Sequence, residues 1–336
     1  MSYKLKQKPE DFTVEEIPSV KDEGKGDYTY FTLEKNGLNT LQAAELIAAK
    51  LGINVKQIGW AGNKDKHAIT TQLISLNKVQ PERAQKLGIA GIKLSYAGRG
   101  TEAIAIGKLK ANRFTITLRN LEESDCTQIL KNTARLKKNS CSMPNYFDEQ
   151  RFSAKNPELG RMMVQEKINE ATKKFPEENL RKMHKSQRLL YVHAYQSLLF
   201  NRMLASHIKK HSRKYSTLEY SRGEMLFPAE KMQNCKIPLI GFGTETPKGE
   251  AGELMLEEMK TEGITTRNFI IRQLPEATSE GNLRDAFVRI KKLKISGFEQ
   301  DELNTGAKKA KISFTLQKGS YATIAIKALT CLNQPK

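Results

Sequence analysis

The hydrophobic period of this chain changes twice, and this change limits its possible folds more than any other feature. Phe114 and Ile116 alternate with polar residues within "RFTITLR", as residues on one face of a strand do. From about Phe152 the pattern turns helical, and "SQRLLYVHAYQSLLFNRML" repeats large apolar residues every four positions. Alternation returns at Ile312 and Phe314. This order of sheet, helices and sheet predicts that an insertion interrupts a first domain.

The first 120 residues predict a mixed sheet with helices. "GLNTLQAAELIAAKLG" has helical spacing, with Asn39 and Gln42 resembling a capping box and Gly52 able to end the helix. "KQIGWAG" and "AITTQLISL" are typical of strands, and they flank the turn "NKDKH". Asp65 should therefore lie at or near the tip of a hairpin. Near the C-terminus, Ser320 is a candidate N-cap for a last helix.

The charge balance indicates a polyanionic partner. The 336 residues include 56 Lys and Arg against 37 Asp and Glu, a net charge of +19. Such an excess favours nucleic acid over a membrane surface, because neutralising phosphates releases counterions. No apolar span of about 20 residues is present, and "MSYKLKQKPEDF" lacks the apolar core of a signal peptide. We therefore expect a cytoplasmic protein with no membrane partner, and no protein partner is evident.

Cysteine and histidine spacing gives no strong metal motif. His207 and His211 lie four residues apart and could face one metal on a helix, but no third ligand is apparent and basic residues surround them. A basic surface is the favoured interpretation, and we expect no metal. The cysteines are too far apart for a CxxC pair and too few for a disulfide framework: Cys126, Cys141, Cys235 and Cys331.

Asp65 stands between Lys64 and Lys66, and two interpretations fit this spacing. The three residues could form a solvated, charged turn. Alternatively, nearby ammonium groups favour an ionised carboxylate that can act as nucleophile or base. Thr70 and Gln72 follow on one strand face, either supporting a polar pocket or decorating an exposed surface.

The stretch "MPNYFDEQRF" interleaves aromatic rings with amide and guanidinium groups. Such groups can read a base edge while a ring stacks on the base. A proline-initiated turn whose aromatic residues belong to the core explains the stretch equally well.

Taken together, four stretches resemble the TruD family of tRNA pseudouridine synthases, in a form like its archaeal members. They are "KQKPEDFTVEE", "AGNKDKHAITTQ", "NYFDEQRF" and "KGSYATIAIKAL", in this order. The resemblance implies an α/β fold of the α+β type, with a mixed, largely antiparallel synthase sheet and helices. It implies a discontinuous catalytic domain, residues 1–152 plus 286–336, and a helix-rich α/β insertion domain, the TRUD domain, at 153–285.

The resemblance also assigns site residues. Asp65 matches the catalytic aspartate, and Tyr321 matches the residue that stacks on the flipped uracil. The other substrate-binding positions are Phe12, Asn145, Phe147 and Lys6. Asp148 departs from the family, since many relatives carry Gly after "NYF".

The function implied by this resemblance is isomerisation of a uridine in tRNA, with uridine 13 as the expected target. The reaction loses no atoms, so no metal or organic cofactor is expected. The alternative is a non-catalytic RNA-binding or RNA-folding protein on the same fold. A nuclease or a methyltransferase is disfavoured, because neither a metal-binding carboxylate cluster nor a persuasive donor-binding loop is visible.

Overall fold

The computed structural model describes residues 3–153 and 155–330, so Cys331 lies outside the described residues. The chain forms two compact units. The first, here called the sheet unit, comprises Met1–Gln128 and Ile290–Gly319. The second, the helical unit, comprises Ile129–Arg289 and Ser320–Lys336.

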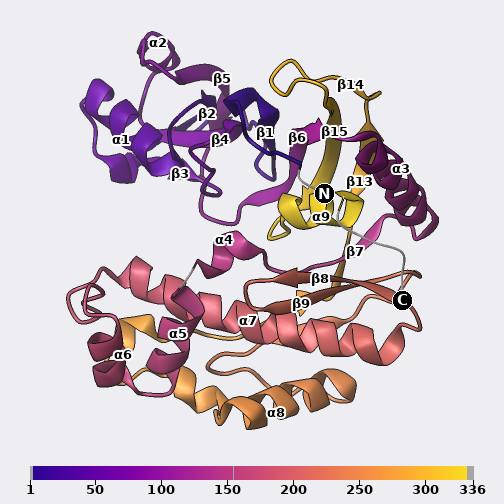
Figure 1. Cartoon of the computed structure of the whole chain (residues 1–336). Helices are drawn as coiled ribbons and strands as arrows, with labels where there is room; N and C mark the ends of the chain where they lie inside the picture. The colour runs from indigo at the N-terminus through magenta and orange to yellow at the C-terminus, as the bar shows by residue number, and fades with distance from the viewer. Residues whose placement is uncertain (1–2, 154, 331–336) are drawn as a thin grey trace. The chain divides into compact units, whose positions relative to one another are not determined.

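A nine-stranded mixed sheet forms the sheet unit within the described residues (Figure 1). The main path runs β13-β15-β6-β1-β4-β2-β5, with β14 beside β15 and β3 beside β4. Only the β1–β4 pairing is parallel among the described pairs of this sheet. The strands are β1 (Phe12–Pro18), β2 (Tyr28–Lys35), β3 (Ile58–Trp60), β4 (Ile69–Asn77), β5 (Ile92–Gly100), β6 (Leu109–Leu121), β13 (Lys291–Ile295), β14 (Glu299–Gln300) and β15 (Lys308–Gln317). The helices are α1 (Thr40–Leu51) and α2 (Pro81–Gln85), and α3 (Glu123–Lys138) crosses into the helical unit.

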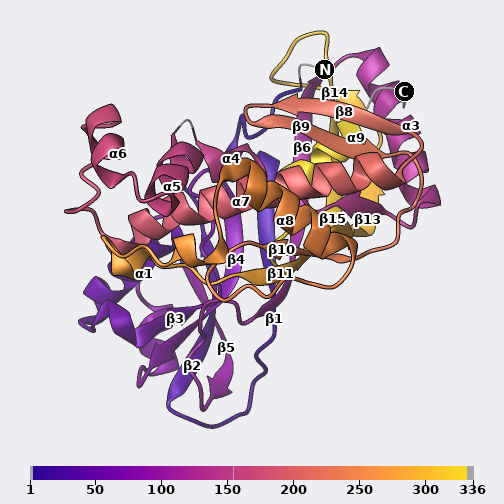
Figure 2. The same cartoon turned by 90° about the horizontal axis from the view of Figure 1, so that it is seen from below.

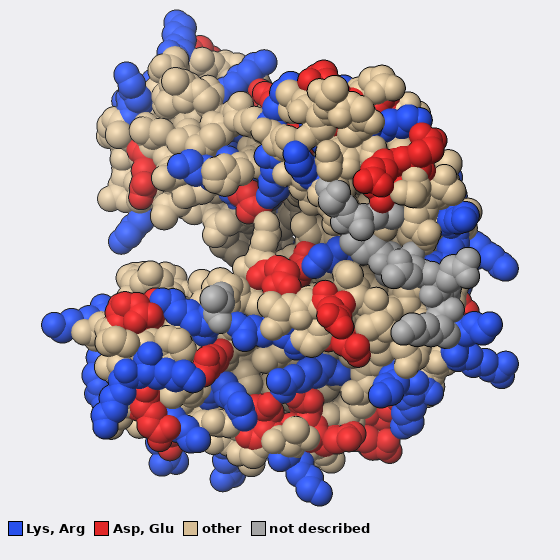
Figure 3. All heavy atoms as spheres, in the orientation of Figure 1, with Lys and Arg blue, Asp and Glu red and all other residues tan. Residues whose placement is uncertain are grey.

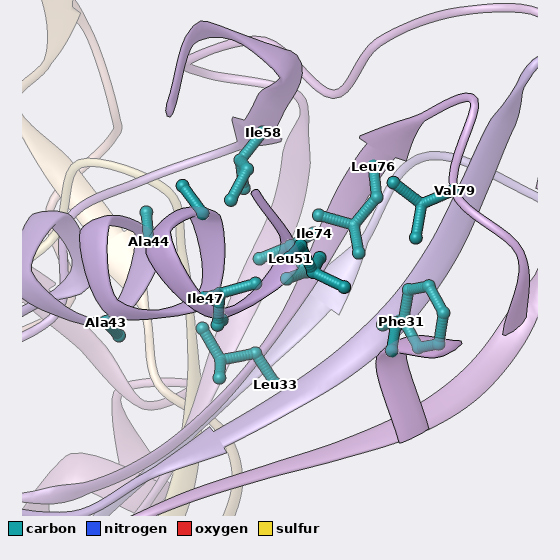
Figure 4. Packing of buried hydrophobic residues seen from close by; sticks show 12 residues of the cluster. Phe31, Leu33, Ala43, Ala44, Ile47, Leu51, Ile58, Ile74, Leu76 and Val79 are labelled. Carbon is teal, nitrogen blue, oxygen red and sulfur yellow. The ribbon is translucent and has the colours of Figure 1, made fainter. Parts of the chain in front are cut away.

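Helix α1 forms as its caps predict. The Asn39 side chain accepts a hydrogen bond from the Gln42 amide, and Gly52 ends the helix in the left-handed region at φ 62°. The buried face of α1 packs on apolar residues of β2, β3 and β4 (Figure 4). Burying each large aliphatic side chain contributes about 1.5–3 kcal/mol, so this packing fixes α1 on the sheet.

The predicted strands on both sides of "NKDKH" are confirmed. β3 pairs antiparallel with the second half of β4, from Ile58 opposite Leu76 to Trp60 opposite Ile74. The first half of β4 instead joins β1 in parallel. Residues 61–68 therefore leave the sheet between these two pairings, and Asp65 lies in this loop.

The helical unit is built around α7, a 27-residue helix. Tyr195, Leu199 and Met203 are buried, which confirms the predicted apolar stripe. Figures 1 and 2 show α7 running beside α8, and both α8 and the β8–β9 hairpin contact it. The remaining elements are β7 (Ser142–Pro144), α4 (Glu149–Phe152), α5 (Asn156–Val164), α6 (Ile168–Lys174), α7 (Lys185–His211), β8 (Tyr215–Tyr220), β9 (Gly223–Pro228), β10 (Lys236–Leu239), α8 (Glu250–Glu262), β11 (Asn282–Asp285), β12 (Phe287–Arg289) and α9 (Ala322–Thr330).

Helix α9 begins one residue later than an N-cap at Ser320 predicts, since such a cap would start the helix at Tyr321. Its first residue is Ala322, and the buried Ser320 hydroxyl has no hydrogen-bond partner among the described residues. The prediction of Ser320 as N-cap is therefore wrong.

Among the described residues, no helix has both the length and the apolar character needed to cross a membrane.

The mixed α+β fold class is confirmed by this arrangement of sheet and helices. The compact units place residues 129–152, 286–289 and 320–336 with the helical unit, whereas the predicted domains group them with the sheet. Compactness does not identify which segment is an insertion. The division into 1–152 plus 286–336 and 153–285 therefore stays a prediction.

A buried guanidinium connects three parts of the sheet unit. Arg119 Nε lies 2.9 Å from both carboxylate oxygens of Asp11, and Nη1 lies 2.7 Å from Asp301 Oδ1. Burial opposes ionisation of Asp301, but hydrogen bonds from two backbone amides, Asn304 and Arg119 together lower its pKa to about 2. The stabilisation from Asp301 is therefore complete above its ordinary pKa of 3.8 and is lost as the pH falls toward 2.

Replacing this guanidinium should be costly. We expect Arg119→Leu to lower the free energy of unfolding by about 3–5 kcal/mol, because it leaves two buried carboxylates without their cation. Urea denaturation at neutral pH measures this loss. The matched control is Arg113→Leu on the same strand, since Arg113 pairs with Glu15 at the surface and such pairs contribute about 0–1 kcal/mol. Equal losses of unfolding free energy in the two variants would contradict the proposed role of Arg119 as the cation that two buried carboxylates require.

Candidate functional site

Asp65 presents a half-exposed carboxylate in the loop between β3 and β4. Its side chain is 53% exposed, and its Oδ2 lies 3.0 Å from Lys6 Nζ. The same ammonium lies 4.4 Å from the centroid of the Phe12 ring, which is buried. The structure therefore brings together three of the predicted site residues: Asp65, Lys6 and Phe12.

The neighbouring lysines in the sequence are not the partners of Asp65. Lys64 turns inward, and its Nζ lies 2.6 Å from Oε2 of the buried Glu16. Lys66 is exposed. The cation that contacts Asp65 is Lys6, 59 residues earlier, so sequence adjacency pointed to the wrong ammonium group.

A buried lysine fixes the backbone of this loop. Lys35, at the end of β2, is 1% exposed and donates hydrogen bonds to the carbonyls of Leu38 at 2.6 Å, Lys64 at 3.3 Å and Asp65 at 2.8 Å. Burial lowers the pKa of Lys35 to about 8, partly offset by the charge of Asp65. The sequence analysis missed Lys35, although it stands in the inward-facing phase of β2 with Phe31 and Leu33.

Two further side chains hold the same loop. Thr40 Oγ1 accepts from the Lys64 amide at 2.9 Å and donates to Gln72 Oε1 at 3.1 Å. Gln72 Nε2 in turn donates to the Gly62 carbonyl at 3.2 Å. Gln72 and Thr70 are both buried, so the interpretation of an exposed strand face is wrong.

The other three predicted residues gather in the helical unit. Phe147 and Tyr321 make an edge contact, with ring centroids 5.8 Å apart. The Arg284 guanidinium lies 4.1 Å from the Phe147 centroid and donates to Asn145 Oδ1 at 2.7 Å. Burial lowers the pKa of Arg284 to about 10. Arg284 therefore links Asn145 to the aromatic pair, and no motif in the sequence indicated it.

The NYF segment is anchored from both sides. Asn201 of α7 accepts from the Phe147 amide at 2.9 Å and donates to the Phe147 carbonyl at 2.9 Å. Asp148 has extended backbone, at φ −104°, and its buried carboxylate pairs with Lys327 of α9. Asp148, which stands where many relatives carry Gly, thus forms an ion pair inside the helical unit. Tyr146 and Phe152 are fully buried, so these two aromatics do belong to the core.

Basic side chains cover much of the visible face of the helical unit. Figure 3 shows Lys and Arg spread over it, with Asp and Glu interspersed rather than segregated.

Comparisons with known proteins identify the relatives of this chain. The family model of tRNA pseudouridine synthase D (TruD) matches residues 1–176 and 161–329. The chain is 31% identical to a tRNA pseudouridine synthase D 2 of Methanocaldococcus jannaschii, covering 96% of this chain and 90% of that protein. It is also 31% identical to the tRNA pseudouridine synthase D of Anaeromyxobacter dehalogenans, covering 97% and 92%. The fold matches a TruD crystal structure from Methanosarcina mazei with a TM-score of 0.72, at 24% identity, over 98% of this chain and 94% of that one.

The contacts of Lys35 predict its effect on stability. We expect Lys35→Met to lower the free energy of unfolding by about 1–3 kcal/mol, because it leaves three partly buried carbonyls without their donor. Amide hydrogen exchange should accelerate most in residues 61–68, where two of those carbonyls lie. The control is the exposed Lys66→Met in the same loop, with an expected change within about 0.5 kcal/mol. Unchanged exchange in the loop of the Lys35 variant would refute this role.

Proposed function

Because the chain belongs to the tRNA pseudouridine synthase D family, we propose that it isomerises uridine 13 of tRNA to pseudouridine. The enzyme is then an isomerase, an intramolecular transferase that moves the base on its own ribose. The family match spans both groups of site residues. The observation that carries the proposal is the ion-paired, half-exposed Asp65 on a loop fixed by buried groups.

The chemistry sets what the protein must do. The target uridine leaves the RNA stack, because its glycosidic bond is inaccessible within a helix. The bond from C1′ to N1 breaks, the uracil turns, and a bond from C1′ to C5 forms. C5 loses a proton and N1 gains one, so the balance requires no co-reactant.

Asp65 is proposed as the catalytic carboxylate. It attacks the ribose anomeric carbon, attacks the uracil ring, or removes a sugar proton on a glycal route; each begins from the ionised form. Lys6 is the cation in contact with this carboxylate, since its ammonium lies 3.0 Å from Oδ2. Lys6 is also available to a phosphate of the bound RNA once the substrate approaches Asp65.

The helical unit supplies the proposed uracil contacts. Tyr321 stacks on the flipped base, and Phe147 supports that ring through its edge contact. Asn145 offers a polar group to the substrate, oriented by its hydrogen bonds with Arg284 and with the Asp285 carbonyl. Phe12 contributes from the sheet unit. Lys and Arg of the proposed insertion domain, 153–285, contact RNA phosphates and position the tRNA.

Loss of the Asp65 carboxylate should abolish turnover. We expect Asp65→Asn to lower pseudouridine formation at least about 1,000-fold on an unmodified tRNA transcript, because the amide is neither a nucleophile nor a base. Carbodiimide-based primer extension detects the product as a stop at one uridine. The matched control is Asp27→Asn, an exposed aspartate of the same unit. Near-normal turnover in Asp65→Asn would sink the assignment, and a wild-type protein that binds tRNA without any stop would favour the non-catalytic alternative.

The aromatic ring at position 321 should matter more than its hydroxyl. We expect Tyr321→Ala to lower kcat/KM by about 10–100-fold, since base stacking on an aromatic side chain contributes about 1–3 kcal/mol. Tyr321→Phe keeps the ring and should stay within about threefold of the wild type. The same primer-extension assay measures both, with melting temperatures as the check on folding. Equal activity in the alanine and phenylalanine variants would argue against stacking.

A further inference from the structure

The end of α7 and the start of α8 bring together three groups that the sequence separates. His207 and His211 lie one turn apart on α7, with ring centroids 4.9 Å apart. Glu250, the first residue of α8 and 39 positions after His211, places each carboxylate oxygen 2.7 Å from His211 Nε2. Its Oε1 lies 3.4 Å from His207 Nδ1. Sequence spacing gave only two imidazoles, and the fold supplies the third group.

From this geometry we propose that His207, His211 and Glu250 form a zinc site. One candidate atom from each residue lies within 4.8 Å of the others. Bonds of about 2.0–2.2 Å to a tetrahedral Zn²⁺ place ligand atoms about 3.3–3.5 Å apart. Small rotations of the partly exposed His211 and Glu250 side chains meet this requirement. Two imidazoles and one carboxylate suit Zn²⁺, whereas Mg²⁺ and Ca²⁺ prefer oxygen ligands alone.

The second nitrogen of His207 supports this assignment. Its Nδ1 faces Glu250, while its Nε2 lies 3.6 Å from Cys235 Sγ. A histidine that binds a metal through one nitrogen carries its proton on the other, and a hydrogen-bond acceptor for that N–H orients the ring. Cys235 Sγ is placed to accept a hydrogen bond from Nε2–H.

The surroundings leave room for the ion and one water. The three groups line an open cavity of about 430 Å³, completed by the segment 230–235. With three protein ligands, water takes the fourth position. Lys210 Nζ lies 3.8 Å from Glu250 Oε1 and is exposed, so it can swing into solvent when the metal supplies the positive charge. The site would then fasten the start of α8 to the end of α7.

Zinc titration of the full-length, untagged, chelator-treated protein tests the proposal by calorimetry. We expect one Zn²⁺ per chain and a raised melting temperature, because a ligand of the native state stabilises it. His211→Ala and Glu250→Gln should weaken binding more than about 100-fold, whereas Cys235→Ser, which changes only the partner of His207 Nε2, should weaken it about 10–100-fold. Both substituted residues are at least partly exposed, so these variants avoid the buried His207.

The matched control is His184→Asn. His184 caps the start of α7, and asparagine keeps a side-chain acceptor for that cap. This variant should bind Zn²⁺ as the wild type does. Absence of stoichiometric binding, or wild-type affinity in His211→Ala, would overturn the site and leave a simple ion pair between His211 and Glu250. The result is independent of pseudouridine formation, because no activity is measured.

Discussion

The position of Lys6, and with it the partner of Asp65, depends on one buried residue. Arg119 holds the N-terminal segment at two points. Its backbone amide donates to the Lys4 carbonyl at 3.1 Å, and its carbonyl accepts from the Lys4 amide at 2.9 Å. Its side chain binds Asp11. Lys6 lies between these two anchors. The turn at Pro9–Asp11 is closed by Asp11 Oδ2, which accepts from the Lys8 amide at 2.9 Å. A short N-terminal segment that would otherwise be mobile is thereby fixed beside the loop that carries Asp65.

Strand pairing places that segment against the right loop. β1 lies between β6 and β4 in the sheet, and its parallel register sets Thr13 opposite Ile69. Because parallel strands run in the same direction, the residues just before β1 and just before β4 lie at the same end of this strand pair. Lys6 comes from the first of these segments, Phe12 is the first residue of β1 itself, and Asp65 comes from the second segment. A parallel pairing within a mostly antiparallel sheet therefore brings the N-terminal motif to Asp65, the proposed catalytic residue.

Local patterns predicted the elements well, because caps and periodicity act over a few residues. The Asn39 cap, the α7 stripe and both strands around Asp65 follow from such patterns. The resemblance supplied the six predicted site residues, which periodicity alone could not select. Residues that act through distant partners were missed: Lys35, Arg284 and Glu250 each look like an ordinary charged residue until the fold brings their partners close. Of these three residues, only Lys35 could have been found from the sequence. It is a charged residue at a strand position whose alternating neighbours, Phe31 and Leu33, are apolar.

The Asp65 loop combines a fixed backbone with a side chain that is easily released. Buried groups hold its carbonyl and amide positions: Lys35, Thr40 and Gln72. The contact with Lys6 is different, since the two side chains are 53% and 21% exposed and an exposed pair of this kind contributes only about 0–1 kcal/mol. A substrate can therefore displace Lys6 at small cost, while the backbone that aims the carboxylate stays in place. A proposed nucleophile needs both properties, because it must keep its position and still exchange its partner for the reacting atom.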